Sequence, residues 1–395
     1  MLTRRYHQHA MQRRSFLSLS AAALSGAAAA RTRWRVGIIG HTGRGNYGHG
    51  IDNVWLSFPE AEIVAVADPD DAGRQRAVER LGAAKGYADY RELLEREKPD
   101  IVSICPRHLD QREAMVTAAA DAGAHIFSEK PFARDLEEAD RMVAAVERAG
   151  VKLQLAHQMR ASPPVQRAVE LAAAGEIGDI QEIRGRGKED QRAGGEDLMV
   201  LGSHIVDVLR MFAGDPQWVF GHVTDNGAEP AKVRRPSEPI GPVAGDQIAA
   251  MYAFDGGVHG YLGSKASDAT DPTRFGTWVY GSRGVLYLRN VIYPSDRPYL
   301  LRSPAWFAPE QRWEPVHAPE EPPAHPDDPY RTANGILVRD LLEAIERDRK
   351  PMCNQEDGRW TAEMILGVYR SQQTGARVPL PQAERNHPLG PISAA

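Results

Sequence analysis

The chain has 395 residues, of which 42% are hydrophobic and 26% are charged, and its formal net charge at pH 7 is −5. This composition is ordinary for a soluble globular protein of two domains or one large domain, and the lack of a basic block beyond the N-terminal segment argues against a nucleic-acid surface. With only two cysteines, Cys105 and Cys353, a disulfide scaffold and a cysteine-rich metal cluster are excluded.

The first 30 residues have the pattern of an export signal. A twin arginine (Arg13 and Arg14) is followed by Ser-Phe, a mild apolar run and small residues suited to cleavage near Ala28–Ala30. This order predicts a Tat signal peptide over residues 1–30, cleavage near residue 30, and export to the periplasm or beyond. The alternative is a frayed basic N-terminus before a short helix. The early His7–His9 lies ahead of the twin arginine, within the predicted signal, and is excluded as a metal site.

The next segment predicts a dinucleotide site. An apolar strand over 34–40 leads into a glycine-dense turn, then a segment over 50–58 that looks helical, and a second strand over 61–68. Strand, glycine turn, helix, strand and terminal acid is the Rossmann order. Glycines let the backbone approach a pyrophosphate, and the acid can bind ribose hydroxyls, which favours NAD over NADP. The alternative is a flexible glycine loop in a sheet protein. The candidate cofactor residues are Gly40, Gly43, Gly45 and Asp68.

Strands and helices then alternate to about residue 157. Helices are expected over 72–82, from 90 to just before Pro99, over 110–123 and over 135–150, strands over 101–106 and 151–157, and a strand and turn over 125–131. This alternation predicts a doubly wound parallel sheet, whose ligands bind beyond the carboxyl ends of the strands. Four strand ends should therefore surround one crevice: Asp68, Cys105–His108, Glu129–Pro131 and His157–Arg160. Cys105 is interpreted as a buried apolar residue rather than a nucleophile.

At one of these strand ends stands "SEKPF", with Lys130 in its centre. A lysine there can hold a substrate hydroxyl, or assist proton transfer if burial lowers its pKa. On its own the motif does not distinguish this lysine from a solvated surface lysine.

In context the chain resembles the glucose–fructose oxidoreductase / inositol dehydrogenase / MocA (Gfo/Idh/MocA) family. The resemblance covers nearly all of the chain after the signal. It rests on the glycine turn after "WRVGIIG", "AVAD", "SICP", "EKPF", "HQMRASPPVQRAVELAAAGEIGDI", a downstream G-x-H-x-x-D and the C-terminal "MCNQEDGRWTAEMILGVYRSQQTGARVPLP".

The resemblance implies an α/β fold in two domains. An N-terminal Rossmann doubly wound parallel sheet would span 31–157. A C-terminal α/β substrate and oligomerisation domain with a large, open, mostly antiparallel sheet would span 158–395, with a helix over about 355–373 able to pack back on the first domain. The family commonly forms dimers or tetramers through the open sheet face. The sequence agrees, since strands with turns at "DGG" and "GSRG" follow residue 179, before a proline-rich, irregular stretch over 303–329.

The resemblance also implies the chemistry: NAD(P)-dependent hydride transfer at a CH–OH group of a sugar, polyol or sugar derivative. Lys130 and His204 would carry proton transfer, and Pro106, Glu129 and Lys130 would join the cofactor site. A histidine suits this work because its pKa lies near working pH. The alternative for His204 is a packed helix histidine.

The chain departs from the family pattern in front of His204. Family dehydrogenases commonly have an aspartate four residues earlier, and here that position is Val200. Asp197 is about 10 Å away along a continuous helix and is interpreted as an N-cap. Asp207, one turn after His204, is the candidate acid to hold the imidazole, with a structural hydrogen bond as the alternative.

The segment 185–192, "GRGKEDQR", should reach the crevice. Lys188 and Glu189 are therefore candidate substrate ligands, with a charged surface loop as the alternative. His157 and Arg160 are candidates for binding substrate oxygens. No metal site is predicted, because the remaining histidines lack metal spacing.

Three functions fit these patterns. The first is a sugar or polyol dehydrogenase that uses NAD. The second is an exported, redox-neutral enzyme that keeps its NAD bound, either a sugar–sugar oxidoreductase or an NAD-dependent glycoside hydrolase. Tat export favours it, because Tat carries folded proteins with cofactors loaded and free NAD is scarce outside the cytoplasm. The third is a non-catalytic sugar-binding protein, motivated by Val200.

Overall fold

The computed structural model describes residues 33–230, 232–234, 236–266, 274–289, 292–306, 310–325 and 328–391. The predicted Tat signal lies outside these residues, so the signal and its cleavage site stay predictions. Arg33–Ala395 form one compact unit. In the described part of the chain, no helix is long and apolar enough to cross a membrane.

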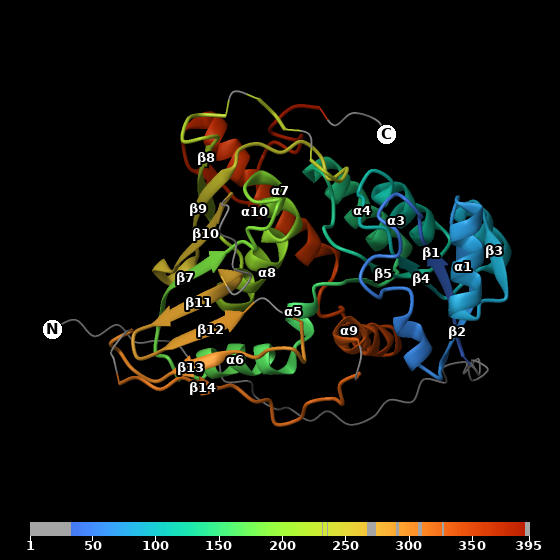
Figure 1. Ribbon diagram of the computed structural model, residues 1–395, viewed down its shortest axis with the longest axis horizontal. Helices are drawn as coiled ribbons and strands as arrows, with labels where there is room; N and C mark the ends of the chain where they lie inside the picture. The colour runs from blue at the N-terminus through green and yellow to red at the C-terminus, as the bar shows by residue number, and fades with distance from the viewer. Residues whose placement is uncertain are drawn as a thin grey trace, which may run out of the picture. The chain divides into compact units, whose positions relative to one another are not determined.

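The first sheet has six parallel strands in the order β3-β2-β1-β4-β5-β6, which confirms the predicted doubly wound N-terminal sheet (Figure 1). Its strands are β1 (Trp34–Ile39), β2 (Ala61–Ala67), β3 (Lys85–Tyr87), β4 (Ile101–Ile104), β5 (His125–Ser128) and β6 (Leu153–Leu155), and its helices are α1 (Asp71–Leu81), α2 (Tyr90–Glu97), α3 (Arg112–Asp121) and α4 (Leu136–Ala149).

Local sequence explains the bounds of these helices. The carboxylate of Asp70 accepts from the backbone of Gly73 at the start of α1, and Asp135 does the same for Glu138 in α4. Gly82 and Gly150 end the two helices with φ of 62° and 67°, which glycine adopts without steric cost.

The helix predicted over 50–58 is wrong. Only Val54–Ser57 is helical, as the short 3-10 element η1. Positive φ values at Gly43, Gly45, Asn46, Gly48 and Gly50 prevent a right-handed helix from starting earlier. The extended conformation of Phe58, which precedes a proline, then ends the element.

The second sheet has nine strands in the order β14-β13-β12-β11-β7-β10-β9-β8-β15. Only β7 and β10 pair in parallel, so the predicted mostly antiparallel sheet is confirmed. The strands are β7 (Ile180–Arg186), β8 (Trp218–Thr224), β9 (Gln247–Ala253), β10 (His259–Lys265), β11 (Gly276–Gly281), β12 (Val285–Arg289), β13 (Tyr299–Leu301), β14 (Glu314–Pro315) and β15 (Val378–Pro379). The short 3-10 element η2 (Asp255–Gly257) turns β9 into β10.

Beyond the first sheet, the described helices are α5 (Gln158–Ala161), α6 (Pro163–Ala173), α7 (Gly195–Val200), α8 (Gly202–Ala213), α9 (Pro329–Glu346) and α10 (Gln355–Thr374). Helix α8 packs on β7, β10 and β11, and α10 packs on β8 (Figure 1). Two C-terminal helices also return to the first sheet, because α10 contacts α4 and α9 contacts η1 and β6. This return brings residues from both sheets and from α9 around one pocket.

Candidate active site

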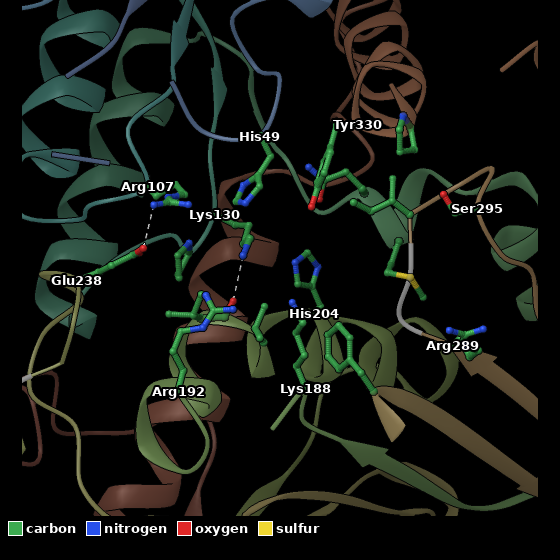
Figure 2. A pocket seen from close by; sticks show the side chains of 18 residues that line it. His49, Arg107, Lys130, Lys188, Arg192, His204, Glu238, Arg289, Ser295 and Tyr330 are labelled. Carbon is green, nitrogen blue, oxygen red and sulfur yellow. Dashed lines mark hydrogen bonds and ion pairs between the residues drawn. The ribbon is translucent and has the colours of Figure 1, made fainter. Parts of the chain in front are cut away.

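A pocket of about 390 Å³ lies where the two sheets and α9 meet (Figure 2). The carboxyl-end loops of the first sheet and α5 contribute His49, Arg107, Lys130, Pro131, Gln158 and Met159. The second sheet, its helices and α9 contribute Lys188, Arg192, Val200, Leu201, His204, Glu238, Phe275, Arg289, Ile292, Ser295, Pro329 and Tyr330. Of the residues predicted as catalytic or substrate-binding, Lys130, His204 and Lys188 line it.

Lys130 stands just beyond β5, before a cis peptide bond to Pro131. Its Nζ donates to the backbone oxygen of Val200 at 3.1 Å, across the pocket from the second domain (Figure 2). Burial lowers the pKa of the Lys130 ammonium, and nearby Glu129 opposes that shift. The lysine is therefore held, buried and directed into the pocket.

Buried Arg112 fixes the turn that carries Lys130. Its guanidinium donates to the backbone oxygens of Pro106 at 2.5 Å, Pro131 at 3.0 Å and Glu129. Pro106, predicted to contact the cofactor, thus serves the turn through its carbonyl. Nothing in the sequence pattern distinguishes Arg112 from the surface arginines of other helices.

His49 is a pocket residue that the sequence analysis missed. Its Nδ1 is hydrogen-bonded to the Glu129 carboxylate, and its ring stacks on Tyr330 with centroids 5.1 Å apart. Burial alone would raise the pKa of Glu129, but His49, Lys130 and Arg112 together lower it. Glu129 is therefore an ionised group that orients His49 and balances Lys130, and it does not itself line the pocket.

His204 is the third residue of α8, and the helix break in front of it explains the contact at Val200. The backbone N–H of His204 donates to Leu201 at 3.1 Å instead of to Val200. The Val200 oxygen is thereby left to accept from Lys130 and from the Ser203 hydroxyl at 3.0 Å. At the sequence position where the family pattern has an aspartate, the polar contact to Lys130 thus comes from the backbone carbonyl of Val200.

The interpretation of Asp197 as an N-cap is wrong. Gly194 precedes α7, and Asp197 lies in its first turn. Its buried carboxylate accepts from the Ser264 hydroxyl at 2.6 Å and from the Glu189 backbone at 3.2 Å. Asp197 therefore ties α7 to β10.

The imidazole of His204 is kept neutral. Burial, and then the positive charge of Lys130, hold the pKa of His204 well below its usual range. Its Nδ1 has no hydrogen-bond partner among the described residues, and its ring lies 5.3 Å from that of His157. A neutral imidazole beside an ammonium group can accept a proton.

Asp207 does not hold His204 as predicted. Its carboxylate accepts from Arg160 Nε at 3.1 Å and Nη2 at 2.5 Å, and lies 3.5 Å from His157 Nδ1. Burial would raise the pKa of Asp207, but Arg160 and His157 lower it strongly. The long side chain of Arg160 reaches the carboxylate from α5.

The predicted substrate roles of His157 and Arg160 are therefore corrected as well. Arg160 pairs with Asp207 and lies 3.3 Å from Asp357. His157 is fully buried behind His204. Neither lines the pocket, and both support the wall that carries His204.

Lys188 and Glu189 point to opposite sides of the chain. Lys188 lines the pocket, whereas Glu189 is buried, pairs with Arg186 at 2.5 Å and Arg274 at 3.0 Å, and accepts from the backbone of Lys265. The predicted substrate contact of Glu189 is thus wrong, since its carboxylate braces β10.

Arg192, Glu238, Arg107 and Arg289 add further charged side chains to the lining. Arg192 belongs to the charged segment 185–192, and it pairs with Asp190 at 2.6 Å. Glu238 lies in a loop without a motif and pairs with Arg107 at 3.1 Å (Figure 2).

A second pocket, of about 240 Å³, lies at the carboxyl ends of β1 and β2. Gly40 and Asp68 line it together with the start of α2. The glycine turn links the two pockets, because His41 lines this one and His49 lines the other. An extended two-ended molecule such as a dinucleotide fits this arrangement.

The glycine turn has the backbone that such a ligand needs. Gly43 has a φ of 79° and open space around its Cα, and Gly45 approaches the Arg107 backbone so closely that a Cβ would lie 2.5 Å from its nitrogen. Successive positive-φ residues in this turn form the kind of concave backbone that binds phosphate.

Asp68 is engaged in holding that turn. It is fully buried and accepts from the Thr42 hydroxyl at 2.7 Å, the Tyr47 hydroxyl at 2.8 Å and the Asp70 backbone at 3.0 Å. A ribose hydroxyl would have to displace Tyr47 or Thr42 to reach it, so the ribose contact stays a prediction. The residues otherwise fit a dinucleotide.

One buried group of potential metal ligands is present among the described residues. Ligand atoms of His157, Asp207 and Cys353 lie within 4.8 Å of one another. Because Arg160 already pairs with Asp207 there, its positive charge opposes a cation.

Two family models match the chain. Residues 34–157 match an oxidoreductase family with an NAD-binding Rossmann fold, and residues 165–287 match the GFO/IDH/MocA C-terminal domain.

Curated relatives and a solved structure agree with these matches. An uncharacterised oxidoreductase of Rhizobium meliloti is 31% identical over 61% of this chain and 70% of its own length. The D-apiose dehydrogenase of Paraburkholderia graminis is 26% identical over 85% of this chain and 88% of its own. A levoglucosan dehydrogenase solved with NADH superimposes with a TM-score of 0.72 at 21% identity, covering 89% of this chain and 100% of that one, which supports the fold.

Proposed function

Because this chain belongs to the GFO/IDH/MocA family of NAD-binding oxidoreductases, we propose that the pocket between Lys130 and His204 is where it oxidises or reduces its substrate. The enzyme is an NAD(P)-dependent oxidoreductase that acts on a CH–OH group of a sugar, polyol or sugar derivative. The observation that carries the assignment of the site is the meeting of Lys130 and His204 from different domains on one pocket.

Each side chain has a defined task in the oxidative direction. Held by the glycine turn and the pocket lined by Gly40 and Asp68, NAD would supply the hydride acceptor for the substrate carbon. The Lys130 ammonium donates a hydrogen bond to the substrate oxygen, positioned for it by the Val200 carbonyl. The neutral His204 imidazole takes the hydroxyl proton as the carbonyl forms. In reduction the same groups return the proton.

Residues behind the pocket support this pair. His157 packs against the His204 ring, and the Asp207–Arg160 ion pair holds the wall behind both histidines. On the other side Glu129 orients His49 and balances the charge of Lys130. The site is thus preorganised by a buried ion pair on one wall and by the hydrogen bond between Glu129 and His49 on the other.

The test is NADH formation from added NAD over a panel of sugars and polyols. At least one should give NADH, and Lys130→Ala should abolish the reaction without loss of NADH binding. If the folded protein binds no nucleotide and releases none on denaturation, the assignment is wrong.

We also propose that the chain is exported by the Tat pathway with its cofactor already bound. The motif around Arg13 and Arg14 supports this, as does the scarcity of free NAD outside the cytoplasm. The denaturation test above distinguishes the two modes: one NAD released per chain favours a redox-neutral cycle, whereas rapid exchange with added NAD favours a simple dehydrogenase.

The open face of the second sheet supports self-association. Trp278 stacks on Tyr287 with centroids 4.1 Å apart, and Trp306, Trp313 and Phe220 are exposed. Apolar aromatic surface of this kind favours a contact with a second copy of the chain. Light scattering of the purified protein should give a dimer or tetramer, and a monomer at micromolar concentration would contradict this.

A further inference from the structure

The lining of the pocket is strongly cationic. Among the described side chains that line it, one is a carboxylate, Glu238, and five are permanent or near-permanent cations: Arg107, Lys130, Lys188, Arg192 and Arg289.

The ion pairs of the lining residues leave the excess positive charge at Lys188 and Arg192. Arg107 is paired with Glu238 at 3.1 Å, and Arg289 with Asp296 at 2.9 Å. Lys188 and Arg192 share a single carboxylate, that of Asp190, at 3.6 and 2.6 Å. Lys188 and Arg192 thus bring more positive charge to the pocket wall than the single carboxylate of Asp190 balances.

The cationic side chains of the lining can donate hydrogen bonds but cannot accept them. Lysine and arginine only donate, whereas a neutral sugar needs acceptors as well, because each hydroxyl both donates and accepts. The one lining carboxylate is already engaged by Arg107. A carboxylate or phosphate only accepts, and it makes the strongest hydrogen bonds with such cations.

Lys188 and Arg192 are placed to meet a substrate rather than the dinucleotide. Both belong to the segment between β7 and α7, on the same side of the pocket as His204 (Figure 2). The glycine turn and the second pocket, which fit the dinucleotide, belong to the first sheet. Their side chains are 41% and 20% exposed, so the cationic groups remain accessible.

We propose that the substrate is an anionic sugar derivative whose carboxylate or phosphate binds Lys188 and Arg192 while its reacting carbon lies between Lys130 and His204. This inference rests on the proposed function, and it adds the chemical class of the substrate. The same pocket should bind the neutral parent sugar less tightly, because a hydroxyl accepts from these cations more weakly than a carboxylate or a phosphate does.

The test compares matched substrates that differ only at one carbon. D-Glucose and D-galactose are each paired with their uronate and their 6-phosphate, and kcat/KM is followed by NADH formation. An acidic member should be preferred by about tenfold or more. Preference for the uronate or for the phosphate identifies the acid, and preference for the neutral sugars overturns the inference while leaving the proposed function intact.

Variants locate the acid-binding group. Lys188→Met and Arg192→Met should each lower kcat/KM for the acidic substrate on the order of 10- to 100-fold, mainly through KM, and should lower it less for the neutral sugar. The exposed Lys350→Met removes the same charge outside the pocket lining and should behave as the parent protein. An equal loss on acidic and neutral sugars would overturn the inference.

A second readout does not depend on turnover. The uronates and phosphates should raise the thermal unfolding midpoint of the NADH-loaded protein, and the effect should be lost in the double variant Lys188→Met/Arg192→Met. If none of them stabilises the loaded protein, the inference fails even when a neutral sugar is oxidised. Failure of NADH itself to bind would instead refute the proposed function.

Discussion

The two walls of the pocket are built in different ways. The wall on the first sheet is built at strand ends: Lys130, Glu129 and the glycine turn all stand there, and Arg112 pins the turn through three backbone oxygens. The wall on the second domain depends on a helix break at Leu201 and on the long-range ion pair between Arg160 and Asp207. The first wall keeps the lysine of the family pattern, whereas the second has Val200 at the position of the family acid and offers Lys130 a backbone carbonyl there.

The two walls differ in which of the paired side chains, Lys130 or His204, has a partner at position 200. Because α8 starts afresh at Gly202, the Val200 carbonyl is free to accept from Lys130. The lysine keeps a partner, while the histidine is left without a neighbouring acid and with a pKa held well below its usual range. We therefore expect the two walls to respond differently to mutation.

The largest effect is expected on the first wall. Lys130→Ala removes the ammonium that contacts the substrate oxygen, and kcat/KM should fall by about 10³-fold. NADH titration should show that cofactor binding survives, and Lys350→Met is the charge-matched control. A loss of less than about tenfold would mean that Lys130 is not a catalytic residue.

On the second wall, His204→Asn should lower kcat/KM by about 10²-fold, because the amide cannot accept the hydroxyl proton. The acid limb of the pH profile should also disappear in this variant. Full activity of His204→Asn would show that the second wall binds the substrate without taking part in proton transfer. The proposed difference between the two walls would then be wrong.

The support of the second wall can be tested by stability. Asp207→Asn leaves Arg160 without its full counter-charge, and the free energy of unfolding should fall by about 3 kcal/mol. Urea denaturation measures this change. Asp215→Asn is the control, since Asp215 forms a more exposed pair with Arg210 and should cost about 1 kcal/mol or less. Equal losses in the free energy of unfolding would mean that the Arg160–Asp207 pair contributes no more to stability than the exposed pair does.

The smallest effect is expected from restoring the family acid. Oxidation needs neutral His204, so kcat/KM falls as pH drops through the pKa of His204, which lies well below 6.5. Val200→Asp puts a carboxylate near the ring and should raise that pKa, moving the acid limb to higher pH. Val200→Asn, of similar size without charge, should not move it. An unchanged limb in Val200→Asp would mean that position 200 does not influence His204.

Features set by local pattern could be predicted from the sequence. The alternation of strands and helices, the position of Lys130 at a strand end, and the "DGG" and "GSRG" turns all follow from neighbouring residues. The failed helix over 50–58 shows the limit, because glycines at positive φ displaced its start.

Features set by contacts between distant segments could not be predicted. Asp207 faces Arg160, 47 residues away, and His49 meets Glu129, 80 residues away. Glu189 turned toward β10 although its neighbour Lys188 lines the pocket. In each case the sequence identified a charged side chain but not the element packed opposite it.

The central claim is that Lys130 and His204 act on one substrate across one pocket. A single-turnover experiment with NAD-loaded enzyme and an accepted sugar, unlabelled or deuterated on carbon, tests it most directly. We predict a burst of NADH that is slower with the deuterated sugar, and loss of the burst in Lys130→Ala/His204→Asn with NADH affinity retained. An undiminished burst in that double variant would contradict the account.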